Sequence, residues 1–248
     1  MKRRKDCRVC RSKNLEKVLD LGMTPLANSY LTEIDQEETY YPLQLMQCSD
    51  CRNVQLAHVV DPKVMFSNYL YTSSTSPVFV KHFDDFAKKM GKKKFVVDIG
   101  GNDGILLKPF QKLESKVLSV DPARNIECAV PAINDFFTTK VAREIVEKYG
   151  KADLVTATNV FAHIDDLDEV VEGVKLLLED GGMFMVEVAD LDQMLKDGSF
   201  DLIYHEHVNY WNLDAFIKFF GLRGMYVSDI ERVPVHGGSL RIYARVSK

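Results

Sequence analysis

The 248-residue sequence predicts an α/β protein in which a doubly wound, mostly parallel sheet ends in an antiparallel strand and follows a small β-rich module. Three observations support this fold class. From residue 94 onward, short β-branched runs alternate with amphipathic helical segments. The first of these runs ends in a glycine-rich turn, and two Cys-x-x-Cys pairs precede the whole pattern.

The composition is that of a folded protein with a sizeable core, because 46% of the residues are hydrophobic and 27% are charged. Lys and Arg number 32 against 36 Asp and Glu, so the net charge is −4 and no global attraction to nucleic acid is expected. The sequence contains no apolar run long enough to cross a membrane, and its basic start lacks the apolar segment of a signal peptide. We therefore expect a cytoplasmic protein that binds neither nucleic acid nor membrane.

The two cysteine pairs, Cys7 with Cys10 and Cys48 with Cys51, predict a structural zinc site. Each Cys-x-x-Cys turn directs two thiolates toward one ion, and four protein ligands leave no open position for catalysis. Redox dithiols or buried free cysteines are the alternatives. The zinc-binding module is expected over residues 1–66, with extended segments at 38–46 and 54–60. Seven of the first thirteen residues are Lys or Arg, and we expect this basic cluster to form a solvated surface.

A helical linker is expected over residues 67–93. Its helix spans residues 77–90 and would bridge the two parts of the chain through five apolar side chains: Val78, Val80, Phe83, Phe86 and Ala87.

The larger domain is expected over residues 94–248. Its parallel strands are predicted at 94–99, 116–120, 129–133, 153–158 and 183–188, with helices at 105–113, 138–149, 167–178 and 213–220. The turn at 180–182 is expected to end the third of these helices. Strands at 225–232 and 240–246 follow each other without a helix, which predicts an antiparallel pair at one edge of the sheet.

The turn after the first strand of this domain predicts a nucleotide-type ligand. Gly100, Gly101 and Gly104 would let the backbone approach the ligand, and Asp121, at the end of the second strand, could accept both hydroxyls of a ribose. A dinucleotide site would need a phosphate-binding loop, whereas the carboxylate of Asp98 would repel phosphates and attract an ammonium group. The loop, including Asn102, therefore favours S-adenosylmethionine over a nicotinamide cofactor.

Motifs along nearly the whole chain resemble those of the sugar C-methyltransferase family, S-adenosylmethionine-dependent enzymes that act on nucleotide-linked deoxyketosugars. The matching pieces are the two cysteine pairs, Tyr41-Pro42-Leu43, the Tyr69–Ser74 segment, Val97 to Gly104, Asn159-Val160-Phe161-Ala162-His163, Tyr204-His205-Glu206-His207 and His236-Gly237-Gly238-Ser239-Leu240-Arg241. The resemblance implies a class I methyltransferase fold of Rossmann type. Family members continue for roughly another domain, so we expect a truncated chain, a partner chain that supplies this domain, or a smaller substrate.

The resemblance also assigns roles to single residues. His207 is the implied base that forms an enolate next to a ketone, Tyr204 and Glu206 position the sugar or support the enolate oxygen, and Tyr71 has an active-site role. Asn159 would hold the amino-acid end of the cofactor, with His163 lining the same cleft unless it merely precedes the next helix. Phe136 is expected to bracket the adenine, although adjacent phenylalanines are also ordinary core residues, and His236 is expected to face the sugar.

Two readings remain beside the sugar C-methyltransferase. The zinc-binding module could guide methylation of RNA or protein, or the chain could be a non-catalytic cofactor-binding half that needs a second chain.

Overall fold

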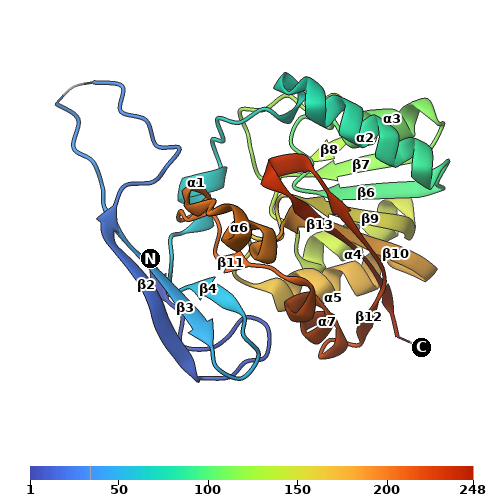
Figure 1. Ribbon diagram of the computed structural model, residues 1–248. Coiled ribbons are helices and arrows are strands. Elements are labelled where there is room, and N and C mark those ends of the chain that lie inside the picture. The colour runs from blue at the N-terminus through green and yellow to red at the C-terminus, as the bar shows by residue number, and fades with distance from the viewer. Residues whose placement is uncertain (34, 248) are drawn as a thin grey trace.

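A seven-stranded sheet forms the centre of the larger domain in the computed structural model, which describes residues 1–33 and 35–247 (Figure 1). The strand order is β12-β13-β10-β9-β6-β7-β8. The strands are β6 (Phe95–Ile99), β7 (Lys116–Val120), β8 (Ala132–Ile133), β9 (Ala152–Thr158), β10 (Leu178–Ala189), β12 (Met225–Val233) and β13 (Ser239–Val246). The first five in chain order pair in parallel, and β13 pairs antiparallel with both β10 and β12. The predicted α/β fold class with an antiparallel closing strand is confirmed.

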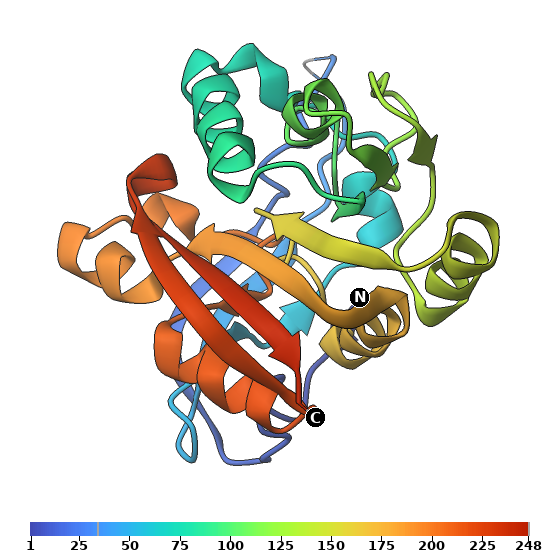
Figure 2. The ribbon, with the colours of Figure 1, turned by 90° about the vertical axis from the view of Figure 1, so that its right-hand side faces the viewer.

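Helices cover both faces of this sheet, as the two ribbon views show (Figures 1 and 2). The helices are α2 (Pro77–Met90) and α3 (Leu107–Lys112) on one face, and α4 (Thr139–Tyr149), α5 (Leu167–Leu177) and α7 (Leu213–Gly221) on the other. The last three begin at side-chain caps, because Thr138, Asp166 and Asn212 each accept a backbone N–H of the first turn. Each layer buries an apolar helix stripe against β-branched strand residues.

Two details of the expected elements are wrong. Helix α5 ends at Leu177 and β10 begins at Leu178, so Gly181 lies inside the strand, at a register shift between Leu178 and Met183. In α2, Val78 and Val80 are 67% and 40% exposed. The buried face consists of Phe79, Phe83, Phe86 and Ala87, which follow the 3.6-residue helical period and pack on α3 and the sheet instead of bridging two modules.

The N-terminal module holds a four-stranded sheet with the order β11-β4-β3-β2, and a two-stranded ribbon of β1 and β5. Its elements are β1 (Lys2–Arg3), β2 (Leu15–Thr24), β3 (Tyr41–Cys48), β4 (Val54–Leu56), β5 (His58–Val59) and α1 (Pro62–Phe66). Strand β11 (Asn209–Tyr210) comes from the other end of the chain and pairs with β4. The module is thus joined to the larger domain by backbone hydrogen bonds.

Helix α6 (Leu191–Asp197) strengthens this junction, because Leu191 and Met194 share an apolar cluster with Leu43, Leu45 and Leu56. Single 3-10 turns at Ser73–Thr75, Phe200–Leu202 and Val235–Gly237 lie in the connecting loops.

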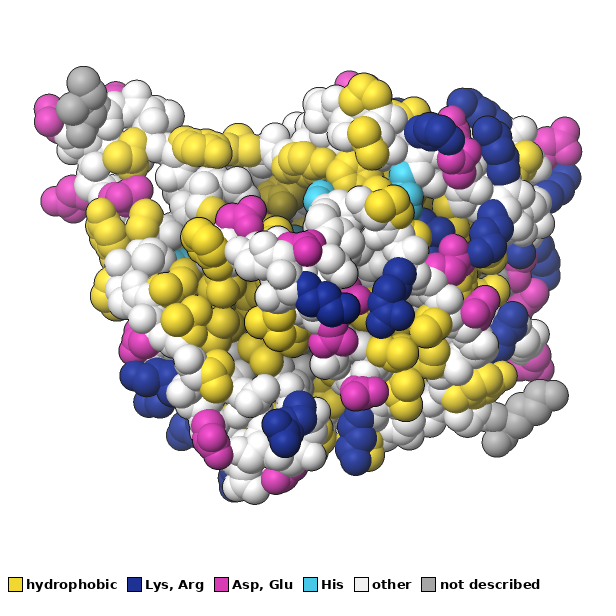
Figure 3. Space-filling view, in the orientation of Figure 1, with side chains coloured by type: hydrophobic (Ala, Val, Ile, Leu, Met, Phe, Trp, Pro, Cys, Tyr) yellow, Lys and Arg dark blue, Asp and Glu magenta, His cyan; other side chains and the backbone are white. Residues whose placement is uncertain are grey.

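The outer strand β2 is largely exposed, including Val18, Leu21 and Met23. Hydrophobic side chains also gather on the left of Figure 3. Among the described residues, no helix is both long enough and apolar enough to cross a membrane.

Candidate active site

A cavity of about 990 Å³ lies at the carboxyl ends of β6, β7, β9 and β10. The sheet contributes Gly100, Asn102, Asp121 and Asn159 to its wall, and the N-terminal module contributes Met1, Lys2, Val59, Pro62 and Phe66. Ligands of open parallel sheets bind at this edge. Both parts of the chain therefore enclose one site, and Figure 3 shows hydrophobic and histidine side chains around a hollow on one face.

The glycine turn leaves no room for side chains at two positions. Gly100 has a φ of 70°, and a Cβ there would lie 2.7 Å from a methyl carbon of Val160. A Cβ on Gly101 would strike the Ser119 hydroxyl and lie 3.1 Å from Asp98. Only glycine fits at these two positions, because Val160 and Ser119 pack directly against the turn. The turn therefore exposes backbone without side chains there.

Asp98 lies beneath the turn and is not one of the residues that line the cavity. Its side chain is 1% exposed and accepts a hydrogen bond of 2.6 Å from the Thr156 hydroxyl. Burial raises the pKa of Asp98 to about 7. In this geometry Asp98 supports the turn from below, unlike the direct contact with a ligand ammonium expected from the sequence.

Asp121 does line the cavity, and it also orders the glycine turn. One carboxylate oxygen accepts the Asn102 backbone N–H at 2.9 Å and the other accepts the Ala123 N–H at 2.8 Å. Burial raises the pKa of this carboxyl above its ordinary value. Phe136 and Asn159, the other two side chains expected near a cofactor, are also on the wall.

The segment that contains Tyr71 is fastened to the glycine turn. The Asn102 side chain accepts the Ser73 N–H at 3.0 Å and donates to the Tyr71 carbonyl at 3.0 Å. Asp103 accepts the Ser74 N–H at 3.2 Å. These contacts bring Tyr71, which is 42% exposed, to the cavity wall beside the turn.

Tyr204 and His207 form a hydrogen-bonded pair that also lines the cavity. A turn brings them together, with the His207 N–H bonded to the Tyr204 carbonyl at 3.1 Å and the ring centroids 4.4 Å apart. His207 Nδ1 lies 2.9 Å from the Leu202 carbonyl oxygen, which can only accept, so Nδ1 carries the proton. Nε2 is then the acceptor for the Tyr204 phenol at 3.1 Å. Burial lowers the pKa of His207 to about 4, which keeps the imidazole neutral.

His163 lies next to this pair. Its ring centroid is 5.1 Å from that of His207 and 5.4 Å from that of Phe66, on which it stacks at 13°. Burial lowers the pKa of His163 well below its ordinary value. Three segments that are distant in the sequence therefore meet in one aromatic wall.

Glu206 and His205 are not among the residues that line the cavity. Glu206 is 4% exposed and accepts hydrogen bonds from Asn28 Nδ2 at 2.6 Å and from the Tyr69 hydroxyl at 3.1 Å. His205 is 2% exposed and lies edge-on to Tyr41. Asn28 and Tyr69 themselves line the cavity. Neither residue is among the site residues predicted from the sequence, although Tyr69 belongs to the Tyr69–Ser74 motif. No sequence pattern marks Asn28.

His236 reaches the cavity from the turn before β13. Its ring lies 4.5 Å from that of Phe79. Nearby, the buried Glu187 carboxylate pairs with Arg241 and with His82, both at 2.8 Å. His82 thus joins α2 to β10 and β13 through this buried cluster.

The four cysteines of the two pairs gather into one cluster, and their sulfur atoms all lie within 4.8 Å of one another. Cys7 and Cys51 are 3.5 Å apart, and Cys10 and Cys48 are 3.6 Å apart. Zn–S bonds of about 2.3 Å in a tetrahedron place the sulfurs about 3.8 Å apart. The donor set and the spacing fit a closed structural zinc site, and none of the four cysteines lines the cavity.

Comparison with known proteins agrees with this architecture. A family model described as "Methyltransferase domain" matches residues 76–228, and one described as "Putative zinc binding domain" matches residues 7–66. The first match covers more than half of the chain, so the chain belongs to the methyltransferase-domain family.

Among curated proteins, the chain is similar to the C-methyltransferase NovU of Streptomyces niveus, with 36% identity over 96% of this chain and 60% of NovU. It is also similar to a ubiquinone biosynthesis O-methyltransferase of Chelativorans, with 27% identity over 47% of each chain. The chain therefore spans about half to 60% of the length of these relatives.

Two solved structures share the fold. The 1,6-didemethyltoxoflavin-N1-methyltransferase of Burkholderia thailandensis, solved with its namesake ligand and S-adenosylhomocysteine, has a TM-score of 0.53 and 14% identity over 81% of this chain and 98% of its own. The glycopeptide N-methyltransferase MtfA has a TM-score of 0.52 and 13% identity over 72% of this chain and 93% of its own. At identities of 13% and 14%, the structural similarity shows that this chain shares their fold.

Proposed function

We propose that this protein is an S-adenosylmethionine-dependent C-methyltransferase that acts on a nucleotide-linked deoxyketosugar through an enolate. The observation that carries the proposal is that the Tyr204–His207 pair and the glycine turn line the same cavity. A methyl donor and a proton acceptor can then meet one substrate. NovU is named a C-methyltransferase, and the similarity to it supports carbon as the atom that is methylated.

The cofactor half of the cavity is built from the residues around the turn. Asp121 offers its carboxylate to ribose hydroxyls, Phe136 offers a ring to the adenine, and the bare backbone at Gly100 admits close approach. When bound there, S-adenosylmethionine supplies an electrophilic methyl group. We assign Asn159 to its amino-acid end, while Asp98 acts from beneath the turn.

The substrate half is built around His207. Carbon becomes nucleophilic when a proton is removed beside a ketone, which requires a neutral base within reach. His207 meets the first condition because its pKa is about 4, and Nε2 carries its lone pair. When the Tyr204 phenol turns to the ketone oxygen, Nε2 becomes free to accept the α-proton.

Tyr204 suits the role of donor to the enolate oxygen. Burial, with the charge of Glu206, raises the pKa of its phenol, so the proton stays on the oxygen at neutral pH. His207 would take the proton from the α-carbon, and that carbon would then bond to the methyl group as the S–CH₃ bond of the donor breaks, with S-adenosylhomocysteine as the leaving group. We assign His163, His236 and Tyr71 to the walls that orient the sugar.

The test is mass spectrometry of the protein incubated with methyl-labelled S-adenosylmethionine and a panel of nucleotide-linked ketosugars. A gain of one labelled methyl on carbon is expected. In D₂O without the donor, the α-hydrogen of the accepted sugar should exchange, because enolate formation precedes transfer. Methylation at oxygen, or transfer without α-exchange in the wild-type protein, would contradict the enolate route.

A further inference from the structure

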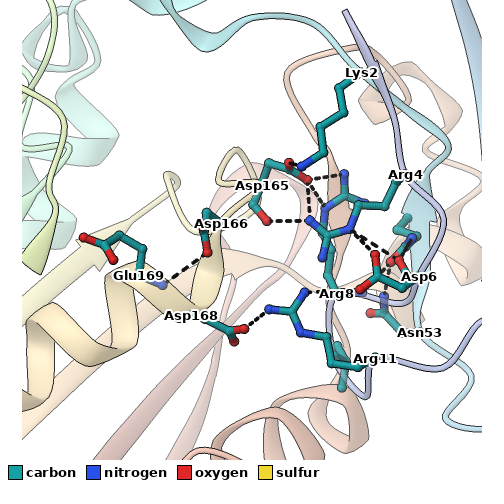
Figure 4. A network of polar contacts seen from close by, with 12 residues as sticks. Lys2, Arg4, Asp6, Arg8, Arg11, Asn53, Asp165, Asp166, Asp168 and Glu169 are labelled. Carbon is teal, nitrogen blue, oxygen red and sulfur yellow. Dashed lines mark hydrogen bonds and ion pairs between the residues drawn. The ribbon is translucent and has the colours of Figure 1, made fainter.

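Two of the seven basic residues around the first cysteine pair, Arg4 and Arg8, are buried against an acidic loop, whereas the other five are exposed, as expected from the sequence (Figure 4). Arg8 stands between Cys7 and Cys10, and its side chain is 0% exposed. Its guanidinium donates from Nε to Asp165 Oδ1 at 3.1 Å and from Nη1 to the Leu56 carbonyl at 3.1 Å. Its charge is therefore matched inside the protein by one carboxylate.

Asp165 receives further cations from the same module. Arg4, whose side chain is 7% exposed, donates to the carboxylate at 3.0 Å and to the Asp165 carbonyl at 3.3 Å. Lys2 approaches the same carboxylate at 3.2 Å but is 66% exposed. Because exposed pairs contribute little, the buried arginines carry most of this attachment.

The loop that ends at Asp165 forms part of the cavity wall. Its His163 N–H bonds to the Val160 carbonyl at 2.8 Å, and the Ala162 carbonyl accepts the Asn209 N–H at 3.2 Å. Asn209 opens β11 and lies two residues after His207. The loop is thus held from one side by β11 and from the other by Arg8.

We propose that Arg8 is a positioning residue that, through Asp165, fixes the loop of residues 159–165 and so sets the placement of His163 beside His207. A guanidinium group is needed at this position, because one side chain must donate hydrogen bonds to both the Asp165 carboxylate and the Leu56 carbonyl. The effect on substrate rests on the proposed function; the placement of the loop does not.

Arg11 provides a matched control. It stands one residue after Cys10, is 43% exposed, and pairs with Asp168 and Asp6 without touching Asp165. Arg8→Met and Arg11→Met therefore remove the same charge from the same end of the module. The double variant Arg8→Met/Asp165→Asn also removes the carboxylate, which in Arg8→Met still has the buried Arg4 as a partner.

The experiment measures amide hydrogen exchange at His163 and Asn209 by NMR, with zinc content and Tm, in the wild type and the three variants. In R8M we expect one zinc per chain and exchange at least tenfold faster at both amides, with R11M like the wild type. In the double variant exchange should stay fast, because the Asp165 carboxylate that links the loop to the arginines is gone. Equal exchange in R8M and R11M, or exchange at the wild-type rate in the double variant, would overturn the proposal.

Kinetics add a second readout once a sugar substrate is in hand. R8M should raise KM for the sugar at least tenfold while the Kd of S-adenosylmethionine changes less than twofold. If the KM for the sugar changes in parallel with Tm across the variants, Arg8 only stabilises the fold. That result would overturn the proposal. If no sugar is methylated by any variant, the proposed function fails, and the exchange data still decide the role of Arg8.

Discussion

The Tyr204 hydroxyl and His207 Nε2 lie 3.1 Å apart, while His207 Nδ1 is bonded to the Leu202 carbonyl at 2.9 Å. These two contacts fix the tautomer of His207 and leave its only lone pair toward the cavity side chain Tyr204. We expect His207→Asn to reduce turnover by about 100-fold or more and Tyr204→Phe to reduce it by a similar or smaller factor. Calorimetry should give an unchanged Kd for S-adenosylmethionine in both variants, because neither side chain belongs to the cofactor half. Full turnover in H207N would remove His207 as the base.

The lowered pKa of His207 has a consequence for pH dependence. The folded value is about 4 and the ordinary value is 6.5, so the unfolded chain takes up the proton first as the pH falls. Stability from this group is complete above pH 6.5 and declines as the pH falls toward 4. Urea titrations between these values should show a smaller decline in H207N than in the wild type. The acidic limb of kcat/KM should likewise lie near pH 4; a limb near 6.5 would contradict a buried neutral base.

Replacing Asp121 tests the cofactor half. Asp121→Ala removes the acceptor for ribose hydroxyls and also frees the N–H groups of Asn102 and Ala123. Hydrogen bonds to charged groups contribute about 1.5–3 kcal/mol each, so we expect the Kd of S-adenosylmethionine to rise by about 10- to 100-fold. Calorimetry measures this directly, and Asp135→Ala, a neighbouring carboxylate that does not line the cavity, is the control. Unaltered cofactor affinity in D121A would place the ribose elsewhere.

The glycine turn predicts a stability difference between two alanine substitutions. In Gly101→Ala, the new methyl group would overlap the Ser119 hydroxyl above Asp98, and overpacking of this kind costs about 1–3 kcal/mol. In Gly221→Ala, at the end of α7, the methyl group meets open space, and we expect a gain of up to about 1 kcal/mol. Urea unfolding of both variants gives the comparison. Equal stabilities would mean that the turn can move away from the sheet.

The four-cysteine cluster predicts one zinc per chain. Cys48→Ser should abolish stoichiometric zinc and unfold the N-terminal module, because the binding energy of a structural zinc is also folding energy. Cys128→Ser, outside the cluster, should keep the metal. Elemental analysis and proteolysis of residues 1–66 measure both effects. A zinc-free wild-type chain with a protected module would contradict the metal-dependent fold.

The sequence by itself determined the alternation of strands and helices, the antiparallel closing strand and the cysteine pairing. These features follow from local chemistry: period-2 and period-3.6 apolar patterns and short ligand spacings. The sequence leaves open whether residues 204–207 form a strand or a helical turn, since four residues fit either. The structure has a turn, and this turn brings Tyr204 to His207.

Only the tertiary structure decided how distant residues are paired. Arg8 becomes a buried anchor because Asp165, 157 positions away, is brought to it. Asp98, expected to attract a ligand ammonium group, is instead a buried support because Thr156 lies on the neighbouring strand. Such pairings depend on which chain segments pack together after folding. No local pattern of charge or hydropathy carries that information.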